Sequence, residues 1–333
     1  MSIPAYYSFG ESPRLHAGHP STASQPGQKL WLKYLNEGGA NIVFRILPIS
    51  EDDELPPHLQ GRLLRLRKDL PHVQSAEDQL AAYHAHFKPL FPRENLTEQI
   101  EIELGDGLAS SVSDALTQLD RPSHRLQDFL PAEERTGMLV TDMTPGPDEI
   151  LLQVKPKWLA QSPNAPPDAR RCRTCALRAQ RASKKIRTAT DAQESCPFDL
   201  ISNDEADRRR AAGRLTDHPL LQKFLINDAQ PLLQKLRDNQ QKLDFQGVLV
   251  ISSDTGALDL CKAMTLRDCT LFLKLSGEAI DARLADLDLK LPEKLGRWKK
   301  VEQELIDHGW YKNTEDSEHW AKEEICLLSR ARS

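Results

Sequence analysis

Several features of common protein classes are missing from this sequence of 333 residues. It contains no run of about 18 apolar residues, so we expect no membrane-spanning helix. The first residues hold neither the basic segment nor the apolar run of a secretory signal, which favours an intracellular protein, nuclear or cytoplasmic. The phosphate-loop pattern GxxxxGK[ST] and the protein-kinase motifs HRDxxxxN and DFG are also absent, which argues against those two enzyme classes.

An excess of positive charge is missing too. The chain has 44 Lys and Arg against 49 Asp and Glu, which gives a net charge of -5. This balance argues against a protein that coats nucleic acid, and we expect no nucleic-acid partner. The cations are nevertheless uneven, since residues 169–187 read ARRCRTCALRAQRASKKIR without one acidic residue. Such a run indicates either a solvated helix face or a local site for an anion.

Cysteine is scarce, with six residues in the whole chain. In a large chain without a secretory signal we expect these thiols to be reduced. Cys172 and Cys175 have the CxxC spacing of zinc and redox sites, but the sequence offers no second CxxC or CxxH pair. Cys196 is the nearest third thiol. The pair is compatible with a structural metal or with ordinary thiols on a helix.

The N-terminal part of the chain is rich in β-forming segments. Residues 1–28, with many Pro, Gly, Ser and His, predict a flexible segment before a fold that begins near Lys29. The stretch WLKYLNEGGANIVFRILPI (31–49) predicts a strand, a tight turn at EGGA and a second strand. Glycines let backbone N–H groups approach a phosphate closely, although a plain hairpin turn explains them equally well. Residues 61–71 predict a further strand with one cationic face.

The remainder mixes both kinds of element. Apolar residues at helical spacing predict helices within residues 75–91, 107–120, 159–240 and 292–311. Apolar runs or alternation predict strands within residues 137–158, 244–256, 264–275 and 281–291. The order predicts an α+β protein with a β-rich N-terminal lobe, a mixed α/β C-terminal lobe and a cleft between the two.

Residues 151–160 read LLQVKPKWLA, an apolar run that ends with two lysines. If the strand continues through them, Lys155 and Lys157 point to the same face. Pro156 removes one backbone donor, which suits an irregular strand end that lines a cleft. The pattern therefore indicates a pair of cations beside Trp158 at the edge of a site.

Six short stretches, in this order and at comparable spacing, resemble motifs of the inositol-pentakisphosphate 2-kinase family, its fungal members most of all. They are EGGAN (37–41), RPSHR (121–125), QVKPK (153–157), CRTCALRAQR (172–181), MTLRDC (264–269) and DLDLK (286–290). Members transfer the γ-phosphoryl group of ATP to the 2-hydroxyl of inositol 1,3,4,5,6-pentakisphosphate and produce inositol hexakisphosphate, or phytate. The resemblance implies a two-lobed inositol polyphosphate kinase-like fold, distantly like that of protein kinases, in a monomeric enzyme that uses ATP and Mg²⁺.

The resemblance also implies roles for individual residues. It divides the chain into a nucleotide-binding lobe (29–143) and a lobe (144–333) that binds inositol phosphate and carries catalysis. The nucleotide contacts that it implies are Gly38, Gly39, Ala40, Asn41, Arg65, Thr141, Asp142, Met143, Gln153 and Lys155. The substrate contacts are Arg125, Lys157, Arg173, Arg181, Asp268, Lys290, Lys294 and Trp298, and Trp298 is equally compatible with a core position. The catalytic residues are Asp268, Lys155 and Asp286, with Asp286 and Asp288 as ligands of Mg²⁺.

The charge of the implied substrate explains why so many of its implied contacts are Lys or Arg. An inositol with five phosphates carries a very dense negative charge, and arginine contacts phosphate through two N–H groups at once. A carboxylate such as Asp268 is suited to orient the acceptor hydroxyl and accept its proton. A hard oxygen ligand such as Asp286 is suited to Mg²⁺.

The sequence departs from the family pattern at a few positions. Gln153 stands where the signature usually has Glu, and Leu177 stands where related segments have His. The family's NNxR segment has no clean counterpart, although Lys223 is a candidate for its arginine, and zinc ligands of longer relatives are not recognisable. Two alternative functions stay open: an inositol polyphosphate kinase of other positional specificity, and a catalytically silent protein that binds phosphoinositides or other polyanions.

Overall fold

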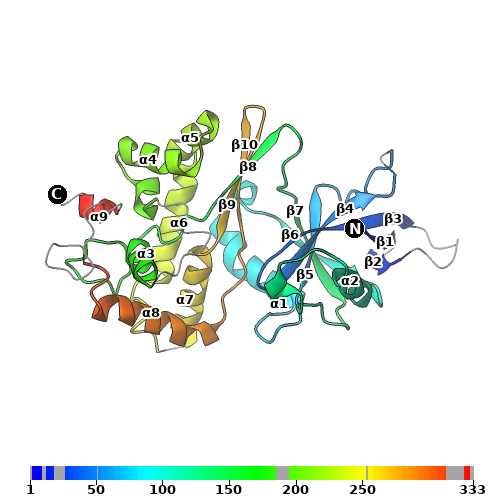
Figure 1. Ribbon diagram of the computed structural model, residues 1–333, viewed down its shortest axis with the longest axis horizontal. Coiled ribbons are helices and arrows are strands. Elements are labelled where there is room, and N and C mark those ends of the chain that lie inside the picture. The colour runs from blue at the N-terminus through cyan, green and yellow to red at the C-terminus, as the bar shows by residue number, and fades with distance from the viewer. Residues whose placement is uncertain are drawn as a thin grey trace. The chain divides into compact units, whose positions relative to one another are not determined.

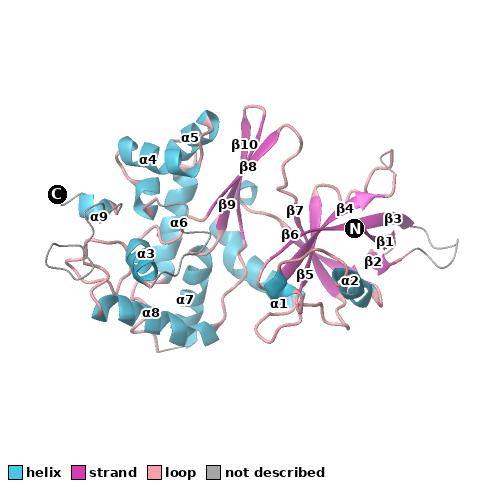
Figure 2. Ribbon diagram, viewed as in Figure 1, coloured by secondary structure: helices cyan, strands magenta, loops and turns pink. Residues whose placement is uncertain are grey.

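The computed structural model describes residues 2–9, 13–18, 27–50, 52–184, 195–252, 254–312 and 326–330. The chain divides into two compact units. The first comprises Met1–His84 and Thr97–Asp142, and the second comprises Ala85–Leu96 and Met143–Ser333. Strands dominate the first unit and helices the second (Figures 1 and 2), so the predicted α+β class is confirmed. The main boundary falls after Asp142, but the short segment Ala85–Leu96, expected in the N-terminal lobe, belongs to the second unit.

The first unit is built on a closed barrel of seven strands. They are β1 (Ser2–Ser8), β2 (Arg14–Ala17), β3 (Gly27–Glu37), β4 (Asn41–Pro48), β5 (Arg62–Arg67), β6 (Gln99–Leu104) and β7 (Thr136–Thr141). Their order around the barrel is β1-β2-β6-β7-β5-β4-β3. The β2–β6 pair is parallel and the other pairs are antiparallel. Closure leaves no open edge between these strands.

Alternating apolar residues fill the barrel. In β4 the side chains of Ile42, Phe44 and Ile46 are buried, one at every second position as a strand requires. Helix α2 (Leu108–Leu116) contributes Leu108 and Val112, which are four residues apart and therefore lie on one helix face. The expected strands within residues 31–49 and 61–71 and the helix within 107–120 are thus confirmed.

The prediction of a flexible segment over residues 1–28 is wrong for residues 2–8 and 14–17. Strand β1 pairs with both β2 and β3 and buries Ile3, Ala5 and Tyr7 in the barrel. The many Pro, Ser and Gly residues of this segment favour a flexible chain. Its alternation of apolar and polar residues is short, and it forms a strand because it pairs with β3. Residues 10–12 and 19–26 lie outside the described part of the chain.

The second unit joins a three-stranded antiparallel sheet to a group of helices (Figure 2). The strands are β8 (Glu149–Val154), β9 (Thr270–Ser276) and β10 (Ala279–Ala285), in the order β10-β9-β8. The helices are α3 (Arg173–Ser183), α4 (Glu205–Leu215), α5 (Pro219–Ile226), α6 (Gln230–Leu243), α7 (Asp254–Leu266), α8 (Leu295–Asp307) and α9 (Leu327–Arg330). The helix α1 (Ala76–Ala82) belongs to the first unit. None of the described helices is long and apolar enough to cross a bilayer.

Two predicted strands differ from the structure, one because it does not form and the other because it ends earlier. The strand expected within residues 244–256 is wrong, since residues 244–252 form turns and coil and helix α7 begins at Asp254. The strand that includes QVKPK is shorter than expected, since β8 ends at Val154. In both places an apolar run favours a strand, but the periodicity of so short a run does not distinguish a strand from a turn or a helix.

Candidate functional site

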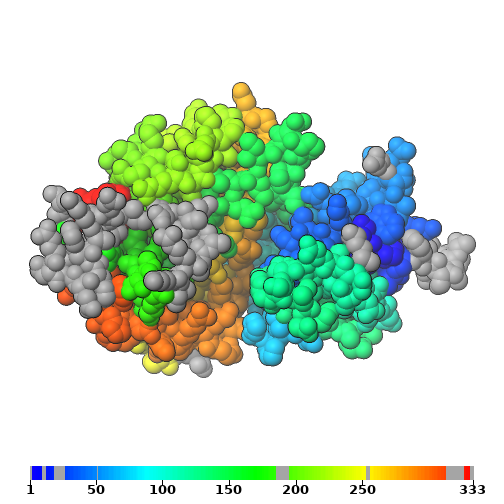
Figure 3. All heavy atoms as spheres, in the orientation of Figure 1, coloured from blue at the N-terminus to red at the C-terminus, as the bar shows by residue number. Residues whose placement is uncertain are grey.

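A cavity of about 290 Å³ lies within the second unit. Its walls come from four places: the chain that follows β8, helix α3, the end of α7 with the two residues after it, and the first turn of α8 with the chain that leads into it. The lining residues are Lys157, Trp158, Arg173, Thr174, Leu177, Arg178, Arg181, Met264, Arg267, Asp268, Lys290, Lys294, Arg297 and Trp298. Figure 3 shows atoms of α3, in green, beside those of α8, in orange, on one surface of this unit, and a shared apolar cluster holds the two helices together.

The wall of this cavity is strongly cationic. Eight of its lining residues are Lys or Arg and a single one, Asp268, is acidic. Cations held together in a partly buried space repel one another and lose water, so the charged forms are less stable there. Burial accordingly lowers the pKa of both Lys157 and Lys294, and the neighbouring cations add to the effect. Such a cavity favours a polyanion, because an anion offsets both the repulsion between the cations and their loss of hydration.

Part of this charge is already used within the protein. The buried guanidinium of Arg267 forms an ion pair of 2.7 Å with Asp244, and Arg173 Nε lies 3.2 Å from Glu302 Oε2. In the described ranges, by contrast, Lys294 and Arg297 form no ion pair. The cavity therefore combines fixed cations, held by buried carboxylates, with cations whose charge is available to a ligand.

Asp268 lies between two lysines of the cavity. Lys290 Nζ is 2.6 Å from Asp268 Oδ2, and Lys157 Nζ is 3.6 Å from Asp268 Oδ1. Burial alone would raise the pKa of this carboxyl group, but Lys290 and then Lys157 and Lys155 outweigh it, so that its pKa is lowered. Asp268 is therefore ionised at neutral pH, and its side chain is half exposed and open to a bound molecule.

Lys155 connects Asp268 to a second carboxylate. Its Nζ donates to the backbone carbonyl of Asp268 at 2.9 Å and lies 3.0 Å from Asp286 Oδ2. The hydroxyl of Thr270 also donates to Asp286 Oδ2. One oxygen of Asp286 is thus held in place, while 58% of the side chain remains exposed. Asp288 lies two residues further along and is half-buried.

The backbone at two of these residues is in the left-handed region. Lys157 has φ of 60° and Asp286 has φ of 58°, and among the described residues no others except glycines have positive φ. This conformation costs an L-residue about 1–2 kcal/mol, and such costs are concentrated at functional sites. Because β8 ends at Val154, the expectation that Lys155 and Lys157 share one strand face is wrong. An irregular stretch of chain that includes the positive φ of Lys157, and not strand alternation, leads both ammonium groups to Asp268.

Two guanidinium groups lie over the ring of Trp158. The guanidinium carbon of Arg267 is 3.5 Å from the centre of the indole ring, and that of Arg173 is 4.6 Å from it. The negative face of an aromatic ring attracts a cation, so the ring holds both arginines in defined positions. Trp158 is only 6% exposed, which gives it a structural role in the floor of the cavity.

Seven of the eight predicted substrate contacts line this cavity. They are Lys157, Arg173, Arg181, Asp268, Lys290, Lys294 and Trp298. Trp298 also packs against the apolar cluster around Leu260, so it serves both of the roles that the sequence left open. Lys223, the candidate for the NNxR arginine, lies exposed on α5 and does not line the cavity.

Three cations of the cavity were missing from the sequence prediction: Arg178, Arg267 and Arg297. Helical spacing would have identified two of them. Arg178 is three residues before Arg181 on α3, and Arg297 is adjacent to Trp298 and three residues after Lys294. Arg267 had no such signal, because its position depends on the ring of Trp158 and on Asp244. Lys185 and Arg187 of the cationic run lie outside the described residues.

The predicted nucleotide contacts at EGGAN form the turn between β3 and β4 in the first unit. The turn is closed by a hydrogen bond of 2.8 Å from the N–H of Gly38 to the carbonyl of Asn41. Neither Gly38 nor Gly39 has positive φ, and an added Cβ would meet nothing closer than 4.0 Å at Gly38 and nothing within 4 Å at Gly39. Internal packing therefore does not require glycine here, which leaves room for a ligand to approach the backbone.

Arg65 supports this turn from β5. With its amide oxygen turned toward the arginine, Asn41 accepts hydrogen bonds from Arg65 Nε and Nη2 at 3.2 and 2.7 Å. Arg65 also donates to Gln79 at 3.1 Å, and it is only 9% exposed. Its guanidinium is thus used within the first unit to fix the residue at the start of β4.

The RPSHR stretch is also attached to the glycine turn. Arg121 donates to both carboxylate oxygens of Glu37, at 2.8 and 3.0 Å, and Lys68 Nζ lies 2.5 Å from the same carboxylate. Arg125 donates to the backbone carbonyl of Glu37. Burial would raise the pKa of Glu37, but Arg121 and Lys68 outweigh it and lower the pKa to about 2. Arg125, predicted as a substrate contact, does not line the cavity of the second unit.

The remaining predicted nucleotide contacts lie where the chain passes from the first unit to the second, at residues 141–143, and on β8. Thr141 ends β7 and its hydroxyl accepts a hydrogen bond from the N–H of Glu98 at 2.9 Å, while the N–H of Asp142 donates to Gly61 at 2.8 Å. Met143 begins the following segment of the second unit and is buried. Gln153 is exposed on β8.

Comparison with known proteins agrees with this arrangement. The family model for inositol-pentakisphosphate 2-kinases matches residues 34–223 and 218–304, which include the glycine turn, the cavity and Asp268. A protein of Yarrowia lipolytica named inositol-pentakisphosphate 2-kinase is 29% identical over 308 residues, which cover 83% of this chain and 91% of that protein. The chain belongs to the inositol-pentakisphosphate 2-kinase family.

Proposed function

We propose that this protein transfers the γ-phosphoryl group of ATP to the 2-hydroxyl of inositol 1,3,4,5,6-pentakisphosphate and so produces inositol hexakisphosphate. The family membership supports the reaction, and the similar protein of Yarrowia lipolytica carries the name of this activity. The observation that carries the proposal is the cavity itself, in which a single carboxylate, Asp268, lies among eight cations. Five phosphates need this many donors, and the acceptor hydroxyl needs one base.

In this reaction the cations of the cavity bind and orient the inositol phosphates. Lys290 and Lys157 hold Asp268 in its ionised form, and the carboxylate accepts a hydrogen bond from the 2-hydroxyl and takes its proton as the hydroxyl attacks. The lowered pKa makes Asp268 a weak base, so we assign it orientation of the hydroxyl as much as proton transfer. Phosphoryl transfer depends mainly on such positioning.

The glycine turn and Lys155 are proposed to bind nucleotide phosphates. The turn is open to a ligand at Gly38 and Gly39, and Lys155 is the cation that is fixed between Asp268 and Asp286. Thr141, Asp142 and Met143 are proposed as the adenine contacts. A two-lobed inositol polyphosphate kinase-like fold, distantly like that of protein kinases, is part of the proposal.

The residues around Asp286 fit a magnesium ion. Mg²⁺ prefers carboxylate oxygens and usually binds through one or two of them together with substrate phosphates. Asp286 offers an exposed carboxylate of which one oxygen is held by Lys155 and Thr270, and Asp288 is the second candidate ligand. The ion would neutralise charge on the nucleotide phosphates.

The test is to incubate purified protein with ATP, Mg²⁺ and inositol pentakisphosphate and to separate the products by anion-exchange chromatography. We expect inositol hexakisphosphate, with at least about 10²-fold slower formation by the Asp268→Asn variant. Inositol tetrakisphosphates and the other pentakisphosphate isomers are assayed in parallel. Preferred turnover of one of them would replace the 2-kinase assignment with another positional specificity. Tight binding without any turnover would show a silent polyanion-binding protein instead.

A further inference from the structure

The wall of the cavity that carries Lys157 and Asp268 is built from two irregular stretches of chain. Lys157 lies three residues after the end of β8 and has positive φ, and Asp268 lies two residues after the end of α7. Neither residue belongs to a strand or a helix. The distance of 3.6 Å between Lys157 Nζ and Asp268 Oδ1 therefore depends on other groups that hold the backbone in place.

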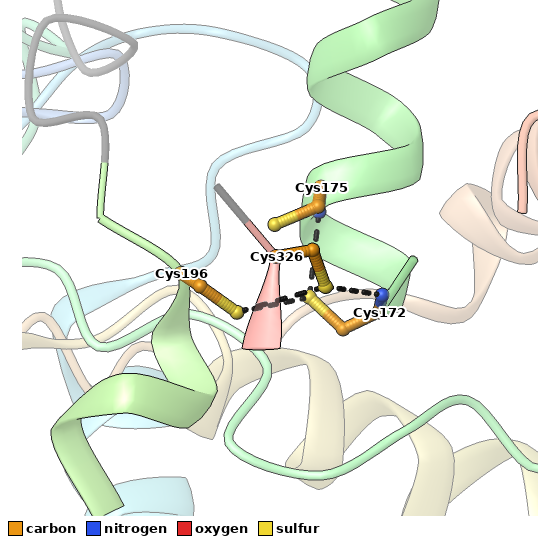
Figure 4. Close-up of side chains that lie close together, drawn as sticks. All are labelled: Cys172, Cys175, Cys196 and Cys326. Atoms are coloured by element: carbon orange, nitrogen blue, oxygen red, sulfur yellow. Dashed lines mark hydrogen bonds between the residues drawn. The ribbon is translucent and has the colours of Figure 1, made fainter. Parts of the chain in front are cut away.

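The wall formed by α3 has a support of its own. Cys172, Cys175, Cys196 and Cys326 are buried and come together at the N-terminus of this helix, with their sulfur atoms within 4.8 Å of one another (Figure 4). The N–H of Cys172 donates to the sulfur of Cys326 at 3.1 Å. These contacts fix the start of α3, and a different group holds the stretches that carry Lys157 and Asp268.

That group is Gln240 on α6, a fully buried side chain that forms hydrogen bonds with both stretches. Its Nε2 donates to the backbone carbonyl of Lys157 at 2.9 Å and to that of Leu266 at 3.3 Å. Its Oε1 accepts a hydrogen bond of 3.0 Å from the N–H of Leu159. One amide thus connects the chain around Lys157 to the chain that leads to Asp268.

The orientation of this amide is determined by its three partners. A glutamine amide has two N–H donors on its nitrogen and an oxygen that accepts. In Gln240 the nitrogen faces two carbonyl groups and the oxygen faces an N–H. A half-turn of the amide would place its oxygen against both carbonyls and break all three hydrogen bonds, so a single orientation is stable. The side chain is therefore a rigid connection between the two stretches.

Two of the bonds act on backbone groups at the limits of regular structure. β8 pairs with β9 as far as Val154, so the carbonyl of Lys157 lies beyond that ladder. Leu266 is the last residue of α7, where carbonyl groups lack partners within the helix, and it also accepts a hydrogen bond from the thiol of Cys269. The left-handed conformation of Lys157 costs free energy and persists only where its surroundings determine it. The bond from Gln240 is one such constraint.

We propose that Gln240 is a positioning residue, which sets the place of Lys157 relative to Asp268 through the backbone of both stretches. Gln240 does not line the cavity, so it acts through the two residues that do. The role rests on the proposed kinase reaction, in which Lys157 binds inositol phosphate and Asp268 orients the acceptor hydroxyl. Displacement of a reacting group by about 1 Å can lower a rate by about 10²-fold. Rigid support for this pair therefore matters for turnover as well as for binding.

The first test is the Gln240→Met variant, which keeps the approximate size of the side chain and removes its three hydrogen bonds. Its affinity for inositol pentakisphosphate, measured by calorimetry, should fall about tenfold, the lower end of the loss expected for a misplaced charge-assisted contact. The KM for ATP should change less. Gln241→Met, the same substitution at the exposed neighbouring residue, is the matched control and should alter neither value. An equal loss for both ligands, or a lower melting temperature with unchanged affinity, would overturn the role.

A double-mutant cycle separates positioning from a general loss of stability. If Gln240 acts through the ammonium group of Lys157, then Gln240→Met should weaken the binding of inositol pentakisphosphate by less than about twofold in a protein that already carries Lys157→Ala. The same loss in both backgrounds would contradict the coupling. These affinities are measured without ATP, so the cycle gives its answer whether or not the protein turns over. Absence of turnover in the wild type would count against the proposed reaction alone.

Gln240→Glu is the second variant if Gln240→Met does not fold. The side chain has the same shape, and its ionised form accepts from the N–H of Leu159 but donates to neither carbonyl, whereas its protonated form regains one donor. Burial raises the pKa of a carboxyl group, so the loss of affinity relative to the wild type at the same pH should shrink as the pH falls below neutral. A loss that does not depend on pH, or no loss at neutral pH, would refute the role of the donors of Gln240.

Discussion

The ammonium group of Lys290 lies 2.6 Å from one carboxylate oxygen of Asp268. The two residues are 22 positions apart, one two residues after the end of α7 and the other five residues before the start of α8, and they meet at the wall of the cationic cavity. Among the described residues this is the only carboxylate of that wall, and the pair fixes it and keeps it ionised.

Replacement of Asp268 by Asn should abolish most of the turnover and leave substrate binding intact. The amide keeps the shape of the side chain but neither accepts a proton nor carries charge, and loss of a catalytic acid or base typically costs about 10²–10⁴-fold in rate. The measurement compares initial rates with the affinity for inositol pentakisphosphate from calorimetry. Removal of a negative charge from a cationic cavity should leave that affinity unchanged or higher. Retained turnover would refute the role of Asp268.

The Lys157→Ala variant should bind inositol pentakisphosphate more weakly, with a smaller effect on ATP. Lys157 lines the cavity and its ammonium group is held near Asp268. Loss of one charge-assisted contact to phosphate typically costs about 1.5–3 kcal/mol, or roughly 10- to 150-fold in affinity. Calorimetry with each ligand separates the two effects. Lys235→Ala, an exposed lysine on α6 outside the cavity, is the matched control. Equal weakening for both ligands would contradict the assignment.

The Asp286→Asn variant should require more Mg²⁺ for half-maximal activity. Asp286 offers the exposed carboxylate beside Lys155, whereas an amide is a weaker ligand for Mg²⁺. A titration of activity against Mg²⁺ at fixed ATP gives the midpoint for the wild type and the variant. Asp288→Asn tests the second candidate ligand in the same way. An unchanged midpoint in both variants would exclude this segment as the magnesium site.

The Glu302→Gln variant should reduce the free energy of unfolding by about 3–5 kcal/mol, because it leaves the buried charge of Arg173 without its partner. Glu302 is fully buried and also accepts hydrogen bonds of 2.6 Å from Ser162 and Tyr311. Denaturant unfolding measures the change. The exposed Glu278 provides the control, since Glu278→Gln should change stability by less than about 0.5 kcal/mol.

Stability should depend on pH through Glu37. Its pKa is lowered to about 2 in the folded protein from an ordinary value of 4.5, so its contribution is fully present above pH 4.5 and is lost as the pH falls toward 2. A shift of this size corresponds to a stabilisation on the order of 3 kcal/mol at neutral pH. The difference in unfolding free energy between the wild type and Glu37→Gln should therefore shrink between pH 5 and pH 2. A difference that stays constant over this range would show that the ion pairs with Arg121 and Lys68 contribute nothing.

The sequence predicted local elements well where one face of a segment is apolar. Alternation in β4 and β5 and helical spacing in α2 and α8 each define a buried face without help from distant residues. The sequence did not predict the backbone of QVKPKW correctly. Strand alternation predicts both lysines on one strand face, whereas the strand ends before them and Lys157 has positive φ.

What the sequence determined by itself is the chemistry available to the protein: the open glycine turn, the cations of α3, the carboxylates of MTLRDC and DLDLK, and a CxxC pair. Only the tertiary structure decided which of them meet. It brings β1 and β2 into the barrel, Arg267 onto Trp158, and Cys326 to the start of α3. Each of these contacts joins residues that are distant in the sequence, and no local pattern specifies such a partner. Burial selects the partner, because a strand edge, a guanidinium or a thiol becomes stable inside the fold only beside a group that satisfies it.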